Sequence, residues 1–92
     1  MDTLSPTDEL QSLRAEIDAI DNELWQLIAR RMDVSRHIGE YKRQNGIRPL
    51  QPARYEQILT RRLQWAQTQG ISAETVRAIM EAIHTESVRI QL

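Results

Sequence analysis

Residues 10–42 read LQSLRAEIDAIDNELWQLIARRMDVSRHIGEYK, and they contain no proline and a single glycine near the end. Steps of three and four residues along this stretch follow one face of an α-helix. Nine of the ten positions on that face are apolar and one is an arginine; the ten are Leu10, Leu13, Ile17, Ile20, Leu24, Leu27, Arg31, Val34, Ile38 and Tyr41. We call this face the apolar seam. It predicts one very long amphipathic helix.

Capping and helix-breaking residues predict where this helix ends and where two more lie. Ser5 followed by Pro6 is typical of a helix start, since proline suits the first helical position. Gly70 is typical of a helix end, and Ser72 of the next helix start. No window alternates as a half-buried strand does. The sequence therefore predicts an all-α chain with three helices, one very long and two shorter, at about 6–44, 52–69 and 73–91.

Length and composition exclude several classes of protein. Ninety-two residues make a single domain, 1–92, of which residues 1–5 are expected to be a frayed N-terminus. The chain has no cysteine and two histidines, so we expect no disulfide, no metal site and no cysteine nucleophile. No apolar run approaches 18 residues, and the N-terminus does not resemble a signal peptide. We therefore expect a soluble, cytoplasmic protein without a membrane partner.

Charge is unevenly distributed although the net charge is only −1. Residues 1–29 carry one arginine and seven acids, whereas residues 30–62 carry nine cations and three acids. A near-neutral total argues against nonspecific nucleic-acid binding, which depends on neutralising phosphates. An acidic beginning and a basic middle instead fit a small anionic ligand, or two chains laid head to tail.

The length of the apolar seam predicts a homodimer. A helix over residues 6–44 is about 57 Å long, whereas the radius of gyration of a compact chain of this size is about 12 Å. Two shorter helices do not cover a seam of that length. A second, antiparallel copy covers it and pairs the acidic part of each chain with the basic part of the other.

Arg31 interrupts the apolar seam, and two explanations are open. It extends its charged end to solvent or pairs with an acid on a neighbouring helix, or it faces a pocket whose ligand supplies a carboxylate. Lys42 lies within about 20° of the same helix face, although a lysine at a helix end is also favourable in solvent. Arg14 is either a surface residue near Asp18 and Asp21, or it reaches the same ligand from an antiparallel partner.

A second polar interruption lies in the helix predicted at 73–91. Its apolar face runs through Val76, Met80, Ile83 and Ile90, and Ser87 is the polar residue on it. Gln91 follows four residues later on nearly the same face. Two seams with polar interruptions favour a binding site over a helical module that only dimerises.

Three stretches of the chain together resemble a known enzyme family. These are Leu13 to Asp21, Leu27 to Met32 with Lys42, and the C-terminal run IHTESVRIQ at 83–91. They resemble the all-helical chorismate mutases of the shikimate pathway over residues 9–92. The resemblance implies an intertwined, antiparallel homodimer with two equivalent pockets. It also implies the Claisen [3,3] rearrangement of chorismate to prephenate without a cofactor or a metal.

The resemblance assigns the substrate carboxylates to Arg31 and Arg54 of one chain and Arg14 of the other, with Ser87 lining the carboxylate site. It assigns the breaking ether bond to Lys42 and Gln91, which would donate hydrogen bonds to the ether oxygen. Such fixed donors stabilise charge that develops in the transition state.

Two positions depart from the family pattern. The acid that binds the substrate hydroxyl in many members is replaced by Gln51, and the glutamate that often follows the arginine of the second helix is replaced by Tyr55. The isochorismate-pyruvate lyases, a related helical family that forms salicylate, keep the same arginine, lysine and glutamine framework and also lack these acids. Lyase activity, and a non-enzymatic dimerisation module, remain the alternatives.

Overall fold

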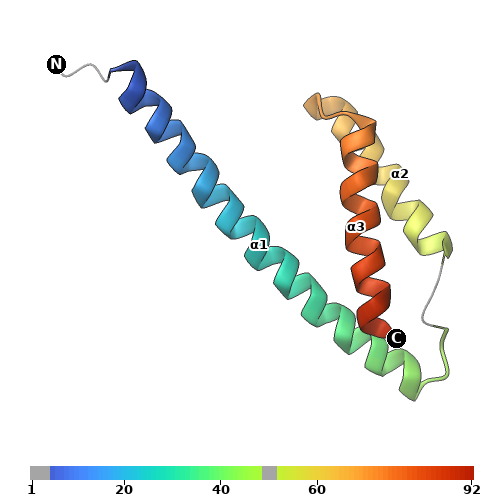
Figure 1. Cartoon of the computed structure of the whole chain (residues 1–92). Coiled ribbons are helices and arrows are strands. Elements are labelled where there is room, and N and C mark those ends of the chain that lie inside the picture. Colours follow the sequence, from blue (N-terminus) through green and yellow to red (C-terminus); the bar gives the residue numbers. More distant parts are fainter. Residues whose placement is uncertain (1–4, 49–51) are drawn as a thin grey trace. The chain divides into compact units, whose positions relative to one another are not determined.

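The computed structural model describes residues 5–48 and 52–92. The described residues form three α-helices and no strand: α1 (Pro6–Gln44), α2 (Pro52–Gln69) and α3 (Ala73–Gln91) (Figure 1). The predicted all-α class and the three predicted helices are confirmed. The chain divides into two parts, residues 1–31 and residues 32–92, and α1 contributes to both.

Serine side chains cap the N-termini of α1 and α3. The Asp8 backbone N–H donates to Ser5 Oγ at 3.1 Å, and Ser5 Oγ donates to the Asp8 carboxylate at 2.8 Å. At the start of α3 the Thr75 backbone N–H donates to Ser72 Oγ at 3.1 Å. The two bonds from the Asp8 and Thr75 backbone N–H groups satisfy donors that a helix leaves without an internal partner.

Two glycines in the left-handed conformation follow the C-termini of α1 and α2. Gly46 has a φ of 65° and Gly70 a φ of 70°, values that cost glycine little because it has no Cβ. After each glycine the chain turns back on the helix: the Ile47 N–H donates to the Lys42 carbonyl at 2.8 Å, and the Ile71 N–H donates to the Ala66 carbonyl at 3.1 Å. This is the usual way in which a glycine ends a helix.

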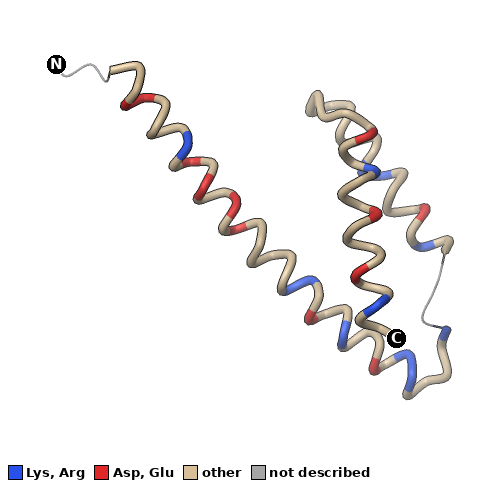
Figure 2. The backbone as a smooth tube through the Cα atoms, in the orientation of Figure 1, with Lys and Arg blue, Asp and Glu red and all other residues tan. Residues whose placement is uncertain are grey.

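The first part of the chain is a single amphipathic helical stretch of α1. Its apolar seam is exposed along its whole length, from Leu10 at 46% to Ile20 at 62% of full exposure. Acidic side chains recur along the same stretch (Figure 2). An apolar stripe of this length in water is typical of a surface that another chain covers.

The second part contains α2 and α3, which lie side by side (Figure 1). Leu59 and Ala66 of α2 and Val76 of α3 are buried. The Tyr55 and His84 rings stack with centroids 4.0 Å apart and an angle of 28° between their planes. This stacking packs His84 of α3 against Tyr55 of α2.

Residues 32–44 of α1 belong to this second part and bury Met32, Ser35 and Gly39. The C-terminal turn of α3 contacts this stretch and buries Ser87 and Gln91. Three buried polar side chains therefore lie where α1 and α3 meet. Among the described residues, no helix combines the length and the apolar character that crossing a bilayer requires.

Candidate active site

Lys42 and Gln91 meet where the last turns of α1 and α3 come together. Lys42 Nζ donates to Gln91 Oε1 at 2.8 Å, and the Gln91 side chain is 8% exposed while Lys42 is half-buried. The two residues are 49 positions apart in the chain, so this contact depends on the packing of α3 against α1. Lys42 and Gln91, the two residues that the resemblance assigns to the ether oxygen, are therefore in direct contact in the structure.

The lysine determines which way the Gln91 amide points. An ammonium group donates hydrogen bonds and accepts none, so it faces the amide oxygen and turns the amide nitrogen the other way. That nitrogen, Nε2, donates to Ser87 Oγ at 3.3 Å. Ser87, which is buried, therefore accepts a hydrogen bond from Gln91 and belongs to the same group of side chains.

Ser35 completes this group and was not predicted from the sequence. Its Oγ lies 2.6 Å from Ser87 Oγ, and its exposed fraction is 3%. It is seven residues before Lys42, a spacing that places both on one face of α1. That spacing was the available signal, but a serine on a long helix is not distinctive without knowledge of what packs against it. We call Ser35, Lys42, Ser87 and Gln91 the polar cluster.

Gly39 allows the two helices to approach closely at the polar cluster. A Cβ atom on Gly39 would lie 2.8 Å from Gln91 Cα and 3.1 Å from the Gln91 carbonyl oxygen. Real Cβ atoms do not approach backbone atoms so closely. The missing side chain of Gly39 is therefore what permits the backbone of Gln91 to lie against α1.

Arg43 holds the main chain of the same glutamine. Its Nη1 donates to the Gln91 backbone carbonyl at 2.8 Å. The last carbonyls of a helix have no internal partner, and a cation near them is favourable. Lys42 and Arg43 of α1 thus hold the side chain and the backbone of one residue at the end of α3.

The other predicted site residues lie outside the polar cluster. Arg54 is exposed near the start of α2, where its Nη1 donates to Gln57 Oε1 at 3.3 Å. Arg14 and Arg31 belong to the first part of the chain and are exposed there. Gln51 lies outside the described residues.

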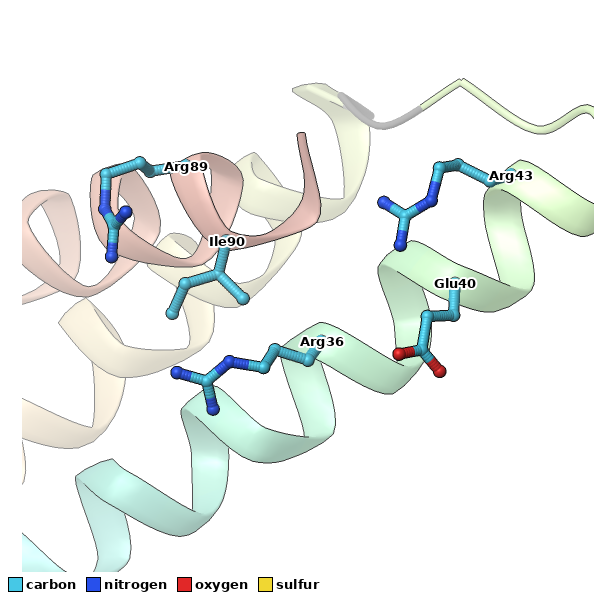
Figure 3. Close-up of a pocket in the computed structure, with 5 residues that line it drawn as sticks. All are labelled: Arg36, Glu40, Arg43, Arg89 and Ile90. Carbon is cyan, nitrogen blue, oxygen red and sulfur yellow. The ribbon is translucent and has the colours of Figure 1, made fainter.

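A charged hollow lies beside the cluster, between the ends of α1 and α3. It has a volume of about 350 Å³ and is lined by Arg36, Glu40, Arg43, Arg89 and Ile90 (Figure 3). Three arginines this close together would favour the binding of an anion. Acidic side chains on the same two helices, however, offset their positive charge.

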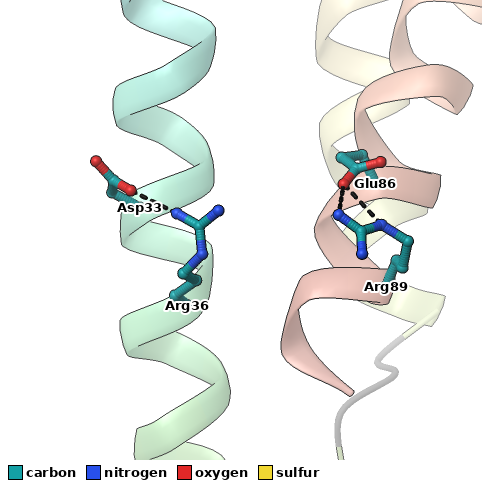
Figure 4. A network of polar contacts seen from close by, with 4 residues as sticks. All are labelled: Asp33, Arg36, Glu86 and Arg89. Carbon is teal, nitrogen blue, oxygen red and sulfur yellow. Dashed lines mark hydrogen bonds and ion pairs between the residues drawn. The ribbon is translucent and has the colours of Figure 1, made fainter.

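Two ion pairs beside the hollow neutralise two of its three arginines (Figure 4). Arg36 donates to Asp33 at 2.5 Å, and Arg89 donates to Glu86 through two guanidinium nitrogens. The hydrogen bond from Arg89 holds the pKa of Glu86 below its usual range. With Glu40 as the third acid, the hollow is balanced in charge and is a weaker anion site than its arginines suggest.

The polar cluster consists of a lysine, an amide and two hydroxyl groups. The described residues contain no group of three or more His, Cys, Asp or Glu side chains arranged to hold a metal ion. What the site presents is a cation and an amide, both held in place by neighbouring side chains. That arrangement suits a reaction that needs fixed hydrogen-bond donors.

Comparison with known proteins identifies the family. Residues 13–92 match the family model described as chorismate mutase type II. The chain belongs to the type II chorismate mutases. Lys42, Ser87 and Gln91, which the resemblance singled out, all lie within the matched range, and membership confirms the predicted enzyme class.

Three named relatives align with most of the chain. The chain is 35% identical to a 4-amino-4-deoxychorismate mutase of Streptomyces pristinaespiralis over 92% of its own length and 66% of the relative. It is 32% identical to a 4-amino-4-deoxychorismate mutase of Streptomyces venezuelae over 96% of its length and 85% of the relative. It is 34% identical to the T-protein of Haemophilus influenzae over 91% of its length. The chain spans 22% of that T-protein and just under two thirds of the first relative. No solved structure matches the chain.

Proposed function

We propose that the chain converts chorismate to prephenate by a Claisen [3,3] rearrangement. In this reaction the ether C–O bond breaks as a new C–C bond forms within the same molecule, so no atom, electron pair or proton is exchanged with the protein. The observation that carries the proposal is the Lys42–Gln91 pair, in which a cation and an amide are held 2.8 Å apart. The partly buried setting strengthens their interaction with a substrate.

The two donors act on the ether oxygen, which gains negative charge as its bond to carbon breaks. An ammonium group has three N–H donors and an amide nitrogen has two, so each residue can hold its neighbour and also donate to a substrate. A fixed donor of this kind contributes about 10²–10³-fold in rate. Holding the flexible substrate in its folded conformation supplies a further part of the acceleration.

The arginines and the small polar residues would bind the rest of the substrate. We assign the two carboxylates to Arg31 and Arg54 of one chain with Arg14 of the partner, since guanidinium groups bind carboxylates with two parallel hydrogen bonds. Ser87 lines the carboxylate site. Gln51 is assigned to the substrate hydroxyl, because it occupies the position of an acid in the family pattern.

A second candidate substrate is 4-amino-4-deoxychorismate, in which an amine replaces that hydroxyl. Two relatives at 35% and 32% identity carry the name of the corresponding mutase. Gln51 is compatible with either group, because an amide both donates and accepts hydrogen bonds. The rearrangement itself is the same for both substrates.

The test is a comparison of kcat/KM for chorismate, 4-amino-4-deoxychorismate and isochorismate with the purified chain. We expect prephenate from chorismate with the highest kcat/KM. A higher kcat/KM for 4-amino-4-deoxychorismate than for chorismate would make the amino compound the assigned substrate. Salicylate and pyruvate from isochorismate, without prephenate from chorismate, would overturn the proposal in favour of the lyase.

We expect the protein to be an antiparallel homodimer, because the apolar seam is exposed from Leu10 to Leu27. Sedimentation should give about twice the chain mass of 10.7 kDa, and unfolding should depend on protein concentration since dissociation and unfolding are coupled. A stable folded monomer at micromolar concentration would contradict the expectation.

The dimer also predicts that Arg14 acts across chains. Arg14→Ala and Lys42→Ala are each expected to be inactive, because each removes one cation from every site. When the two variants are unfolded and refolded together, about half of the dimers are mixed, and each mixed dimer regains one complete site out of two. Activity should recover to roughly a quarter of the wild-type value. No recovery would place Arg14 and Lys42 of one chain in the same site.

Gly39→Ala is expected to lower kcat by about 10-fold. Alanine favours a helix over glycine by about 0.5–1 kcal/mol, so local propensity alone predicts a more stable protein. The added Cβ would lie 2.8 Å from Gln91 Cα, however, and would push Gln91 away from Lys42. The measurement is kcat beside a thermal melt. A variant with a raised melting temperature and unchanged kcat would contradict the close approach of α1 and α3.

A further inference from the structure

The directions of the hydrogen bonds in the polar cluster follow from one residue. Lys42 only donates, so it faces Gln91 Oε1, and Gln91 Nε2 in turn donates to Ser87 Oγ. A serine hydroxyl has one hydrogen to donate and two lone pairs that accept. After accepting from Gln91, Ser87 retains one hydrogen and one lone pair for its remaining neighbours.

The hydrogen bond between Ser35 and Ser87 uses either the hydrogen or the remaining lone pair of the Ser87 hydroxyl. Ser35 Oγ lies 2.6 Å from Ser87 Oγ, and either hydroxyl can be the donor. If Ser87 donates to Ser35, its only hydrogen is occupied. If Ser35 donates to Ser87, then Ser87 accepts two hydrogen bonds and its own hydrogen can turn toward a third group. The two arrangements differ only by rotation of two hydroxyl hydrogens.

We propose that Ser35 is a positioning residue that orients the Ser87 hydroxyl to donate a hydrogen bond to a carboxylate of the substrate. When the substrate binds, Ser35 donates to Ser87, and Ser87 donates to a substrate carboxylate. Accepting two hydrogen bonds makes the Ser87 hydroxyl a stronger donor, because hydrogen bonds in a chain polarise one another. The inference rests on the proposed function, since it concerns how the same site holds its substrate.

Burial of the pair supports a role that requires fixed geometry. Ser35 is 3% exposed and Ser87 8% exposed. Every buried side-chain nitrogen and oxygen in the described part of the chain has a hydrogen-bond partner. Removing the Ser35 hydroxyl would leave Ser87 with Gln91 as its one remaining partner in the cluster. A hydroxyl held from one side only is less well oriented toward the substrate.

The experiment measures KM and kcat for Ser35→Ala, Ser87→Ala and the double variant. We expect Ser35→Ala to raise KM by about 3–10-fold, which is the scale of one hydrogen bond. We expect kcat to change by less than about twofold, because Lys42 and Gln91 remain in place. We expect no further rise in KM when Ser35→Ala is added to Ser87→Ala, since residues that act through one another are not additive. Ser12→Ala, at an exposed position of α1, is the matched control and should leave both constants unchanged.

A second variant separates the hydrogen bond from packing. Ser35→Cys retains a side chain of similar shape but hydrogen-bonds weakly, so we expect it to raise KM as Ser35→Ala does. An unchanged KM in both variants, additive effects with Ser87→Ala, or loss of the folded state in both would overturn the positioning role. A wild-type protein that rearranges neither chorismate nor its amino analogue would instead overturn the proposed function, and the inference with it.

Discussion

Lys42→Met is expected to lower kcat for chorismate by about 10³-fold or more while the protein remains folded. Removing one preorganised donor costs about 10²–10³-fold, and this change affects two donors. Lys42 Nζ donates to Gln91 Oε1 at 2.8 Å, which turns the amide nitrogen of Gln91 away from the lysine and toward Ser87. Without the ammonium group the amide loses this constraint, so the direction of the second donor is lost with the first.

The measurement is kcat, with circular dichroism to check the helices. Arg77→Met is the matched control, since it removes one positive charge at an exposed position of α3 that lies outside the site. We expect the control to be close to wild type, because steering by net charge changes little with a single distant cation. A Lys42→Met protein within about 10-fold of the wild-type kcat would contradict the assignment of Lys42 to the ether oxygen.

Gln91→Glu is expected to lose about 10²–10³-fold in kcat at neutral pH and to regain activity as the pH falls. A neutral amide donates at any pH, whereas a carboxyl group donates only when protonated. The carboxylate form would also repel the negative charge that develops on the ether oxygen. The substitution thus replaces a donor whose state does not depend on pH with one that titrates.

The sign of the pH dependence follows from the surroundings of residue 91. Burial raises the pKa of a carboxyl group, whereas Lys42 Nζ at 2.8 Å from the present amide oxygen lowers it. Because a close cation and a hydroxyl that can donate both favour the charged form, we expect the pKa of the introduced glutamate to stay below neutrality. Activity should therefore rise from pH 8 toward pH 5 in the variant, while residue 91 contributes no such rise in the wild type.

The readout is the ratio of variant to wild-type kcat across pH, which cancels titrations that both proteins share. Gln67→Glu adds the same charge at an exposed position of α2 and is the matched control. We expect its ratio to stay flat with pH. A Gln91→Glu protein as active as wild type at pH 8 would show that Gln91 makes no contact with the ether oxygen.

The ends of the helices could be predicted because the signals are local. Ser5 and Ser72 bond to backbone N–H groups three residues ahead, and Gly46 and Gly70 end helices through bonds that span five residues. Such interactions form within a single turn and do not depend on the rest of the fold. The helices begin and end at the bounds of about 6–44, 52–69 and 73–91 that the sequence predicts.

Part of the candidate site was also visible in the sequence. Lys42 and Gln91 are placed by helical spacing from Arg31 and Ser87, polar residues on otherwise apolar faces. The structure brings Lys42, Ser87 and Gln91 together. The roles of Arg14, Arg31, Arg54 and Gln51 stay predictions.

Three features of the site depended on tertiary structure: the Ser35–Ser87 hydrogen bond, the close approach at Gly39 and the bond from Arg43 to the Gln91 carbonyl. Each joins α1 to α3 across about 50 positions of the sequence. Helical periodicity indicates which face a residue occupies, but not the depth or register at which two faces meet. The local chemistry of the chain thus determined its helices and the residues that could act together. The packing of α3 on α1 decided which atoms touch and which way the Gln91 amide points, because those depend on the distance between two helix backbones.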